Sequence, residues 1–209
     1  MPEHPIFAAI YDRALAGIEK GGLREMRAAL LREARGRTLE LGAGTGLNLD
    51  HYTDAVSDLV LAEPDPHMAR RLRERLDREP PAPRSVEVIE APAEGLPFDD
   101  GSFDTVVTTL VFCTVDNPDR AAAEAKRVLV EDGRLLYLEH VRSQRPGLGR
   151  WQDWIERPWG WIAGGCHPNR ASDEAFAGAG FRIERLDRGT MPKALPPVRP
   201  MIIGVARRP

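Results

Sequence analysis

A glycine-rich turn with the sequence ELGAGTG, from Glu40 to Gly46, has the spacing that points most directly to ligand chemistry. It follows a predicted strand and precedes a short predicted helix, so its glycines let the backbone bend sharply and approach a ligand closely. A dinucleotide-binding turn has the pattern G-x-G-x-x-G, whereas here the third glycine comes one position early and Leu47 takes its place. The turn contains no lysine, which excludes a phosphate-binding P-loop. The early glycine argues against a nicotinamide oxidoreductase.

A carboxylate, Glu63, ends the second predicted strand and is followed by Pro64-Asp65. A carboxylate at this place can accept hydrogen bonds from both hydroxyls of a ribose. Glu63 follows the glycines by slightly less than about 20 residues, which fits one strand–helix–strand crossover. The alternative is a solvated strand end.

One histidine and the two cysteines are the candidates for further chemistry. His140 ends the fifth predicted strand, where its imidazole can act as a general base, cap the strand or orient a tryptophan. Cys113, just after the fourth strand, and Cys166, in a later loop, either line a pocket or are small buried apolar residues. Neither cysteine has metal-type or redox-type spacing, and no carboxylate cluster suits Mg²⁺, so we predict no metal site.

The segment Leu148–Ile162 carries all four tryptophans, which are Trp151, Trp154, Trp159 and Trp161. Such a cluster forms an apolar lid over a lipophilic ligand or packs the helix onto the sheet, and the sequence favours neither reading. Tyr11, on the first predicted helix, is a candidate to close the same pocket.

The chain alternates predicted strands and helices, which is typical of crossover units and a mainly parallel sheet. Strands are predicted at Arg37–Leu41, Asp58–Glu63, Ser85–Ala91, Phe103–Val111, Arg134–Val141, Phe181–Asp187 and Met201–Ala206. Helices are predicted at about Pro5–Ala34 with a break at Gly21-Gly22, Asn48–Tyr52, Pro66–Glu79, Pro118–Val130, Leu148–Ile162 and Ala171–Ala179.

Composition narrows the class of protein. A length of 209 residues fits one domain with its own core, and a net charge of −3 gives no basic field for nucleic acid. No secretory signal and no membrane-spanning apolar run are visible, so the cytoplasm is the expected location. Peripheral membrane contact by the first helix and the oligomeric state stay open.

Four segments occur in an order that resembles the class I methyltransferases, which use S-adenosylmethionine. They are ELGAGTG, LAEPD, APAEGLPFDDGSFDTVVTTLVFCTV and AAAEAKRVLVEDGRLLYLEH. The resemblance covers nearly the whole chain and implies an α/β, Rossmann-like fold: a seven-stranded, mainly parallel sheet with one antiparallel strand and helices on both faces. It implies one domain over residues 1–209, with a helical cap (1–36), a cofactor-binding core (37–141) and a substrate-side segment with closing strands (142–209).

The resemblance also implies which residues hold the cofactor. Those facing its methionine part are Glu40, Gly42, Ala43, Gly44, Thr45, Gly46 and Asn48. Glu63 would hold the ribose, and Thr109 and Leu110 would lie under the methyl donor.

Around the adenine, Pro64 and Met68 would flank the ring, while Ala93 and Glu94 would approach its edge through backbone groups. Pro92 stands where many relatives carry an aspartate, so the usual side-chain contact to the adenine amino group lacks its aspartate.

The second half is similar to the methyltransferase-like proteins that methylate alkyl thiols at the endoplasmic reticulum membrane. The similarity rests on TLVFCTV, LEHV, Trp151-Gln152, Pro158-Trp159 and Gly165-Cys166. Those proteins begin with an apolar membrane anchor that this sequence lacks, so a soluble relative is expected. The resemblance implies methyl transfer to a small lipophilic acceptor, best a thiol sulfur, near Tyr11, Cys113, Trp151, Trp154 and Cys166.

Two other functions stay open at this point. One is methyl transfer to a phospholipid amine, a quinone carbon or a natural-product hydroxyl. The other is a protein that binds S-adenosylmethionine without turnover, which the glycine turn and Glu63 would equally serve.

Overall fold

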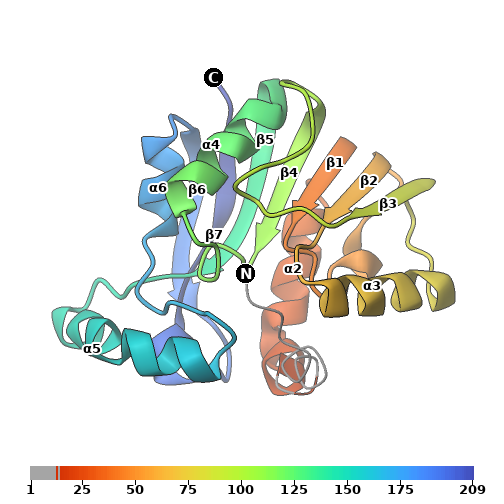
Figure 1. The fold of residues 1–209 in the computed structure, drawn as a ribbon. Helices are drawn as coiled ribbons and strands as arrows, with labels where there is room; N and C mark the ends of the chain where they lie inside the picture. The colour runs from red at the N-terminus through yellow and green to blue at the C-terminus, as the bar shows by residue number, and fades with distance from the viewer. Residues whose placement is uncertain (1–12, 14) are drawn as a thin grey trace.

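The computed structural model describes residues 13 and 15–209, which form a seven-stranded sheet with helices on both faces (Figure 1). The strands are β1 (Gly36–Leu41), β2 (Val56–Ala62), β3 (Ser85–Ile89), β4 (Phe103–Thr109), β5 (Leu129–His140), β6 (Arg182–Thr190) and β7 (Pro200–Arg207). Their order is β3-β2-β1-β4-β5-β7-β6, and β7 runs antiparallel to both of its neighbours. The predicted fold class is confirmed.

The helical elements are η1 (Glu19–Leu23), α2 (Arg24–Leu31), η2 (Leu49–His51), α3 (Pro66–Arg78), α4 (Pro118–Val128), α5 (Pro146–Ile162), α6 (Ser172–Gly178) and η3 (Pro196–Val198). Both α3 and α4 begin with proline, whose fixed φ suits the first helical turn. Asp65 and Asn117 cap these helices by accepting backbone N–H groups, which stabilises each helix start.

Alternate residues of the central strands pack into two cores, one on each face of the sheet. On β4, Val106 packs with the alanines of α4 and with Phe176 of α6. Its neighbour Val107 faces the other core, with Leu30 of α2 and Leu72 of α3. Strands buried on both faces account for the near-continuous apolar runs in the sequence.

The N-terminal helical region breaks where the sequence predicts. Gly22 has a φ of 126°, a conformation that residues other than glycine rarely adopt, and it kinks the chain within η1, just before the regular helix α2. Within the part of the chain that the structure describes, none of the helices combines the length and apolarity that a membrane span requires.

Several strand boundaries differ from the predicted ones by one to five residues. β4 stops at Thr109 rather than Val111, because Leu110 has a φ of 59° and turns the chain out of the sheet. β5 begins at Leu129 rather than Arg134, and its early part contains Asp132 with a φ of 57°.

The parallel strands bring separate parts of the sequence to one edge. The carboxyl ends of β1, β4 and β5 are Leu41, Thr109 and His140, and these strands are adjacent in the sheet. Ligands of open α/β sheets bind beyond this edge. The glycine turn, the loop after β4 and His140 therefore meet at the place where a ligand is expected.

Candidate functional site

The glycine turn is held in a conformation that requires glycine for two different reasons. Gly42 and Gly44 both have a φ of 58°. A Cβ on Gly42 would lie 2.7 Å from Cγ2 of Val111, so the turn packs directly against the loop after β4. A Cβ on Gly44 would meet its nearest atom only at 4.0 Å, so Gly44 leaves open space where a ligand can approach the backbone.

Glu63 joins this turn to the start of α3. Its Oε2 accepts a hydrogen bond from the backbone N–H of Gly44 at 2.7 Å, and its Oε1 accepts one from Asp65 at 2.9 Å. Burial raises the pKa of Glu63, and these two backbone hydrogen bonds oppose that rise. Each carboxylate oxygen can accept a further bond, so Glu63 is positioned to receive two hydroxyl groups.

A buried hydrogen-bond network lines the pocket beside the turn. Asn48 donates from Nδ2 to Oε1 of Glu40 and to Oγ1 of Thr109, both at 2.9 Å. Tyr52 donates to Oε2 of Glu40 at 2.6 Å. Burial raises the pKa of Glu40 to about 7 despite these donors. The sequence assigned Glu40, Asn48 and Thr109 to the cofactor, and the structure brings them together.

Arg27 is part of this network and was missed by the sequence analysis. It is 2% exposed, and its Nη1 donates to Asn48 Oδ1 at 2.9 Å and to Thr109 Oγ1 at 2.8 Å. Its Nε donates to Glu19 at 3.0 Å. The helical stripe Leu23, Arg27, Leu30, Leu31 carries one charged residue among buried leucines, and that pattern could have identified it.

The pocket itself lies between this network and the turn. It is lined by Arg27, Glu40, Gly42, Ala43, Gly44, Thr45, Leu47, Asn48 and Thr109. Most of these residues are ones that the sequence assigned to the cofactor, so the structure gathers that group at one place.

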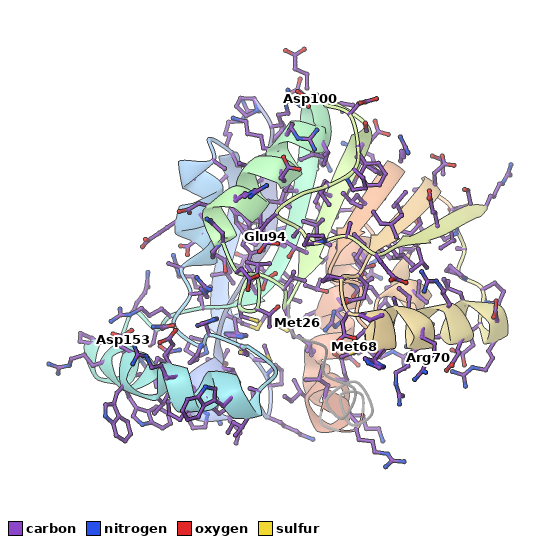
Figure 2. The ribbon with its side chains drawn as sticks, viewed as in Figure 1. Met26, Met68, Arg70, Glu94, Asp100 and Asp153 are labelled. Carbon is purple, nitrogen blue, oxygen red and sulfur yellow. The ribbon has the colours of Figure 1, made fainter. Side chains whose placement is uncertain are left out.

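The residues assigned to the adenine lie on the neighbouring elements. Met68 is buried in the first turn of α3, and Ala93 is buried in the loop after β3 (Figure 2 labels Met68 and Glu94). Glu94 accepts hydrogen bonds from Asp116 at 2.7 Å and Asn117 at 3.2 Å, so its side chain fastens the start of α4. Pro92 is exposed. Because the side chain of Glu94 is engaged in these hydrogen bonds, its backbone is the part that can contact a ligand.

Glu139 organises the loop after β4, and sequence analysis did not identify this role. The side chain is fully buried, and its carboxylate accepts hydrogen bonds from Oγ1 of Thr108 at 2.6 Å, from the Val111 N–H at 3.0 Å and from the Phe112 N–H at 3.2 Å. Burial raises the pKa of Glu139 to about 7. This carboxylate fixes the strained Leu110 turn and the position of Cys113 that follows it.

Cys113, His140 and Cys166 form a buried cluster at the ends of β4 and β5. One ligand atom from each residue lies within 4.8 Å of the others. Nε2 of His140 is 3.1 Å from Sγ of Cys166, and the indole N–H of Trp159 points at the same sulfur from 3.4 Å. The sequence named all three cluster residues separately, but their spacing in the chain did not show that they are neighbours.

The cluster favours one ionised thiol. A hydrogen bond with Cys113 is the largest cause that lowers the pKa of Cys166, and the charge of His140 lowers it further. The same hydrogen bond and burial raise the pKa of Cys113. Burial alone would lower the pKa of His140, but the neighbouring Cys166 raises it overall.

His140 as a general base stays a prediction. Its Nε2 faces a protein sulfur, and its Nδ1 is buried without a hydrogen-bond partner among residues 13 and 15–209. The ring is 4% exposed. Tyr11, the predicted pocket-closing residue, lies outside the described residues.

The tryptophans of α5 do not pack the helix onto the sheet as one of the two interpretations expects. Trp151, Trp154 and Trp161 are 40%, 80% and 87% exposed, and Figure 2 shows indole side chains projecting from α5 away from the sheet. Trp159 is half-buried and reaches Cys166.

Gln152, the neighbour of Trp151, fastens α5 instead. It is fully buried, donates to the carbonyls of Val141, Pro168 and Pro197 at 2.6–3.2 Å, and accepts from Ser143 N at 2.7 Å.

A larger cavity lies between α4, α5 and α6. It is lined by Pro118, Asp119, Glu156, His167, Asn169, Arg170, Ala171, Glu174 and Ala175. The backbone N–H of His167 donates to the Cys113 carbonyl at 2.7 Å, so this cavity adjoins the cluster. Its charged lining does not suit a lipophilic ligand.

Comparison with known proteins points to methyl transfer. Residues 39–137 match the family described as "Methyltransferase domain". The chain is 34% identical over 170 residues to thiol S-methyltransferase TMT1B of Homo sapiens, covering 80% of this chain and 69% of that protein. It is 32% identical over 140 residues to a phosphatidylethanolamine N-methyltransferase of Cereibacter sphaeroides, covering 67% and 68%. A solved S-adenosylmethionine-dependent methyltransferase from Thermotoga maritima shares the fold, with a TM-score of 0.71 at 22% identity over 98% of this chain and 97% of that one.

Proposed function

Because this chain belongs to the class I S-adenosylmethionine-dependent methyltransferases, we propose that it transfers the cofactor's methyl group to the sulfur of a small lipophilic thiol. The observation that carries the proposal is the pair of sites at one sheet edge. A pocket lined by the residues that we assign to the cofactor lies beside β1, and a sulfur- and imidazole-lined cluster lies at the ends of β4 and β5. The similarity to a thiol S-methyltransferase supports the choice of sulfur.

The cofactor's nucleoside would lie between the glycine turn and α3. Glu63 would accept hydrogen bonds from the two ribose hydroxyls, because both of its oxygens are already oriented by backbone N–H groups. Pro64 and Met68 would flank the adenine, and the backbone of Ala93 and Glu94 would meet its edge.

The methionine part would lie over Gly42–Gly46, in the pocket that Arg27 lines. We assign the carboxylate of the cofactor to Nη2 of Arg27, because Nε and Nη1 already donate to Glu19, Asn48 and Thr109, and Nη2 can donate a charge-assisted hydrogen bond. Asn48 and Thr109 already orient that guanidinium. This arrangement would direct the methyl group toward Leu110 and the cluster beyond it.

Methyl transfer then needs a thiolate held in line with the cofactor's sulfonium. Holding the two reacting atoms about 3–3.5 Å apart removes roughly 7–11 kcal/mol of the barrier. The acceptor sulfur forms a bond to the methyl carbon as the bond to the sulfonium breaks, giving a thioether and S-adenosylhomocysteine. The thiol must lose its proton first, since the thiolate is the nucleophile.

An amine acceptor is the second candidate, and the similarity to a phosphatidylethanolamine N-methyltransferase favours it. An amine would need no sulfur-rich surroundings, so the buried cysteines support the thiol acceptor.

The experiment is a methylation assay with isotope-labelled S-adenosylmethionine and purified protein. The acceptors are an alkanethiol, the matching alkylamine, a phenol, a quinol and phosphatidylethanolamine in vesicles. We expect a labelled thioether from the alkanethiol and none from the amine of equal chain length. Methylation of the amine or the lipid in preference to the thiol would overturn the proposal. Binding of the cofactor without transfer to any acceptor would point to a binding protein.

A further inference from the structure

Three side chains that can bind a soft metal ion meet at the carboxyl ends of β4 and β5, and they come from three separate parts of the chain. Cys113 follows β4, His140 ends β5, and Cys166 follows α5. We propose that these residues form a three-ligand zinc site whose fourth position binds the acceptor's sulfur. The metal site stands by itself, whereas the role of its fourth position rests on the proposed function.

The distances suit one shared ion. Zinc bonds of about 2.3 Å to sulfur and about 2.0–2.1 Å to nitrogen place the two sulfurs and the nitrogen of a tetrahedral site about 3.5–3.8 Å apart. The ligand atoms of the cluster already lie within 4.8 Å of one another. The separation of 3.1 Å between His140 Nε2 and Cys166 Sγ would widen by a few tenths of an ångström.

The chemistry of the ligands selects the kind of ion. Two thiolates and an imidazole suit Zn²⁺ or another soft ion, whereas Mg²⁺ and Ca²⁺ require oxygen ligands. Two thiolates also neutralise Zn²⁺, so the buried site would carry no uncompensated charge. Three protein ligands with one open position are the arrangement of catalytic rather than structural zinc.

The surrounding groups hold these ligands rigidly. His140 is part of β5 and pairs with Met201 of β7. Glu139 fixes the loop that leads to Cys113 through the N–H groups of Val111 and Phe112. The Trp159 N–H is directed at Cys166 and would stabilise its thiolate when the sulfur binds a metal.

The step that follows balances without any other reactant. The acceptor R–SH gives its proton to solvent and binds Zn²⁺ as R–S⁻. The sulfur attacks the sulfonium methyl, so one S–C bond forms while the S–C bond of the cofactor breaks. The anionic thiolate and cationic sulfonium become a neutral thioether and neutral S-adenosylhomocysteine. A thioether binds zinc weakly, so the product leaves.

The first test is the metal content of protein purified under reducing conditions. We expect about one zinc per chain in the wild type, and loss of zinc in Cys113→Ser, His140→Ala and Cys166→Ser. His67→Gln, a histidine of α3 outside the cluster, is the matched control and should keep its zinc. Circular dichroism and cofactor calorimetry show whether each variant is folded.

A second measurement uses the unmodified chain in case a variant fails to fold. Zinc is removed with a chelator and replaced by Co²⁺, and we expect a sulfur-to-cobalt charge-transfer band that shifts when an alkanethiol is added. A metal-free wild type that takes up no Co²⁺, or one with a Cys113–Cys166 disulfide in place of the ion, would overturn the proposal.

Activity distinguishes this proposal from the proposed function. A cysteine thiol, with a pKa of about 8.5, is only a few per cent ionised at pH 7, and an alkanethiol is a weaker acid, so the metal-free enzyme should methylate the alkanethiol at least about 30-fold more slowly at that pH. Equal rates with and without zinc would refute the metal's role but keep the thiol acceptor. Zinc binding without any thiol methylation would refute the proposed function but keep the metal site.

Discussion

The two ends of the site are built in different ways. At the cofactor end, a short stretch of chain sets the geometry: Gly42 and Gly44 adopt left-handed conformations, and Glu63 fastens the turn through backbone groups. At the acceptor end, side chains from distant segments meet, and single buried residues such as Glu139 and Gln152 hold the loops together. The cofactor end therefore depends on local backbone conformation, and the acceptor end depends on a few long-range contacts. Damage to the α5 clamp at the acceptor end should therefore leave the cofactor end folded.

The largest expected effect comes from removing the clamp of α5. Gln152→Leu leaves three carbonyls and the Ser143 N–H without their partner in a buried place, and each such group costs about 1–3 kcal/mol. We expect a loss of about 4 kcal/mol in the free energy of unfolding, measured by urea denaturation. Arg150→Leu, on an exposed position of the same helix, is the control. Protein that stays folded should still bind S-adenosylmethionine. A loss of cofactor affinity of similar size would show that the cofactor end depends on the clamp at Gln152.

The second effect tests the buried network of the cofactor end. Glu40 has a pKa of about 7 in the folded state against 4.5 as its ordinary value, because burial disfavours its charge. The folded state thus holds this proton more tightly, so wild-type stability falls as the pH rises from about 4.5 to 7 and stays reduced above pH 7. That fall is on the order of 3 kcal/mol.

Glu40→Gln removes this titration, so the variant should gain stability relative to wild type between pH 4.5 and pH 8. Denaturation at both pH values measures the difference, with the exposed Glu87→Gln as the control. A stability difference that does not change with pH would mean that folding does not raise the pKa of Glu40.

A smaller effect concerns the cofactor alone. Glu63→Ala should weaken S-adenosylmethionine binding by about 1.5–3 kcal/mol, the range for hydrogen bonds to a charged group. Isothermal titration calorimetry measures this, and Glu87→Ala on β3 serves as the exposed carboxylate control. Unchanged affinity would remove Glu63 from the ribose site.

The smallest effect on stability should come from the exposed tryptophans. Trp154→Ala should change the free energy of unfolding by less than about 0.5 kcal/mol, because its side chain is 80% exposed, whereas Trp151→Ala, at 40% exposed, should cost more. We expect each to raise the acceptor KM while cofactor affinity stays nearly constant. An unchanged KM in both variants would exclude these indoles from acceptor binding.

The sequence predicts the cofactor end better than the acceptor end for a physical reason. The turn, Glu63 and the alternation of strands and helices are local patterns, because backbone conformation and burial on both faces leave traces within a few residues. The left-handed conformation of Leu110 was not predicted, because it carries no local signal in the sequence. The β-branched run before Leu110 instead suggests a longer strand.

Contacts between distant segments were not visible in the same way. Cys113, His140 and Cys166 were each named as candidates, yet their clustering follows from strand order and from the clamp at Gln152. Arg27 is masked by the leucines around it. The sequence left the α5 tryptophans equally as lid or core residues, and only the buried Gln152 shows which side of the helix faces the protein.

The contact between Val111 and the glycine turn has a consequence for the order of events. The side chain of Val111 occupies the space where a Cβ on residue 42 would lie, so it packs against Gly42. The N–H of Val111 donates to Glu139, the residue before His140. A shift of the β5 end on acceptor binding would thus move the glycine turn that we assign to the cofactor. Cofactor and acceptor should influence each other's affinity by the same factor in both directions, as linkage requires. Whichever ligand binds first would then favour binding of the other.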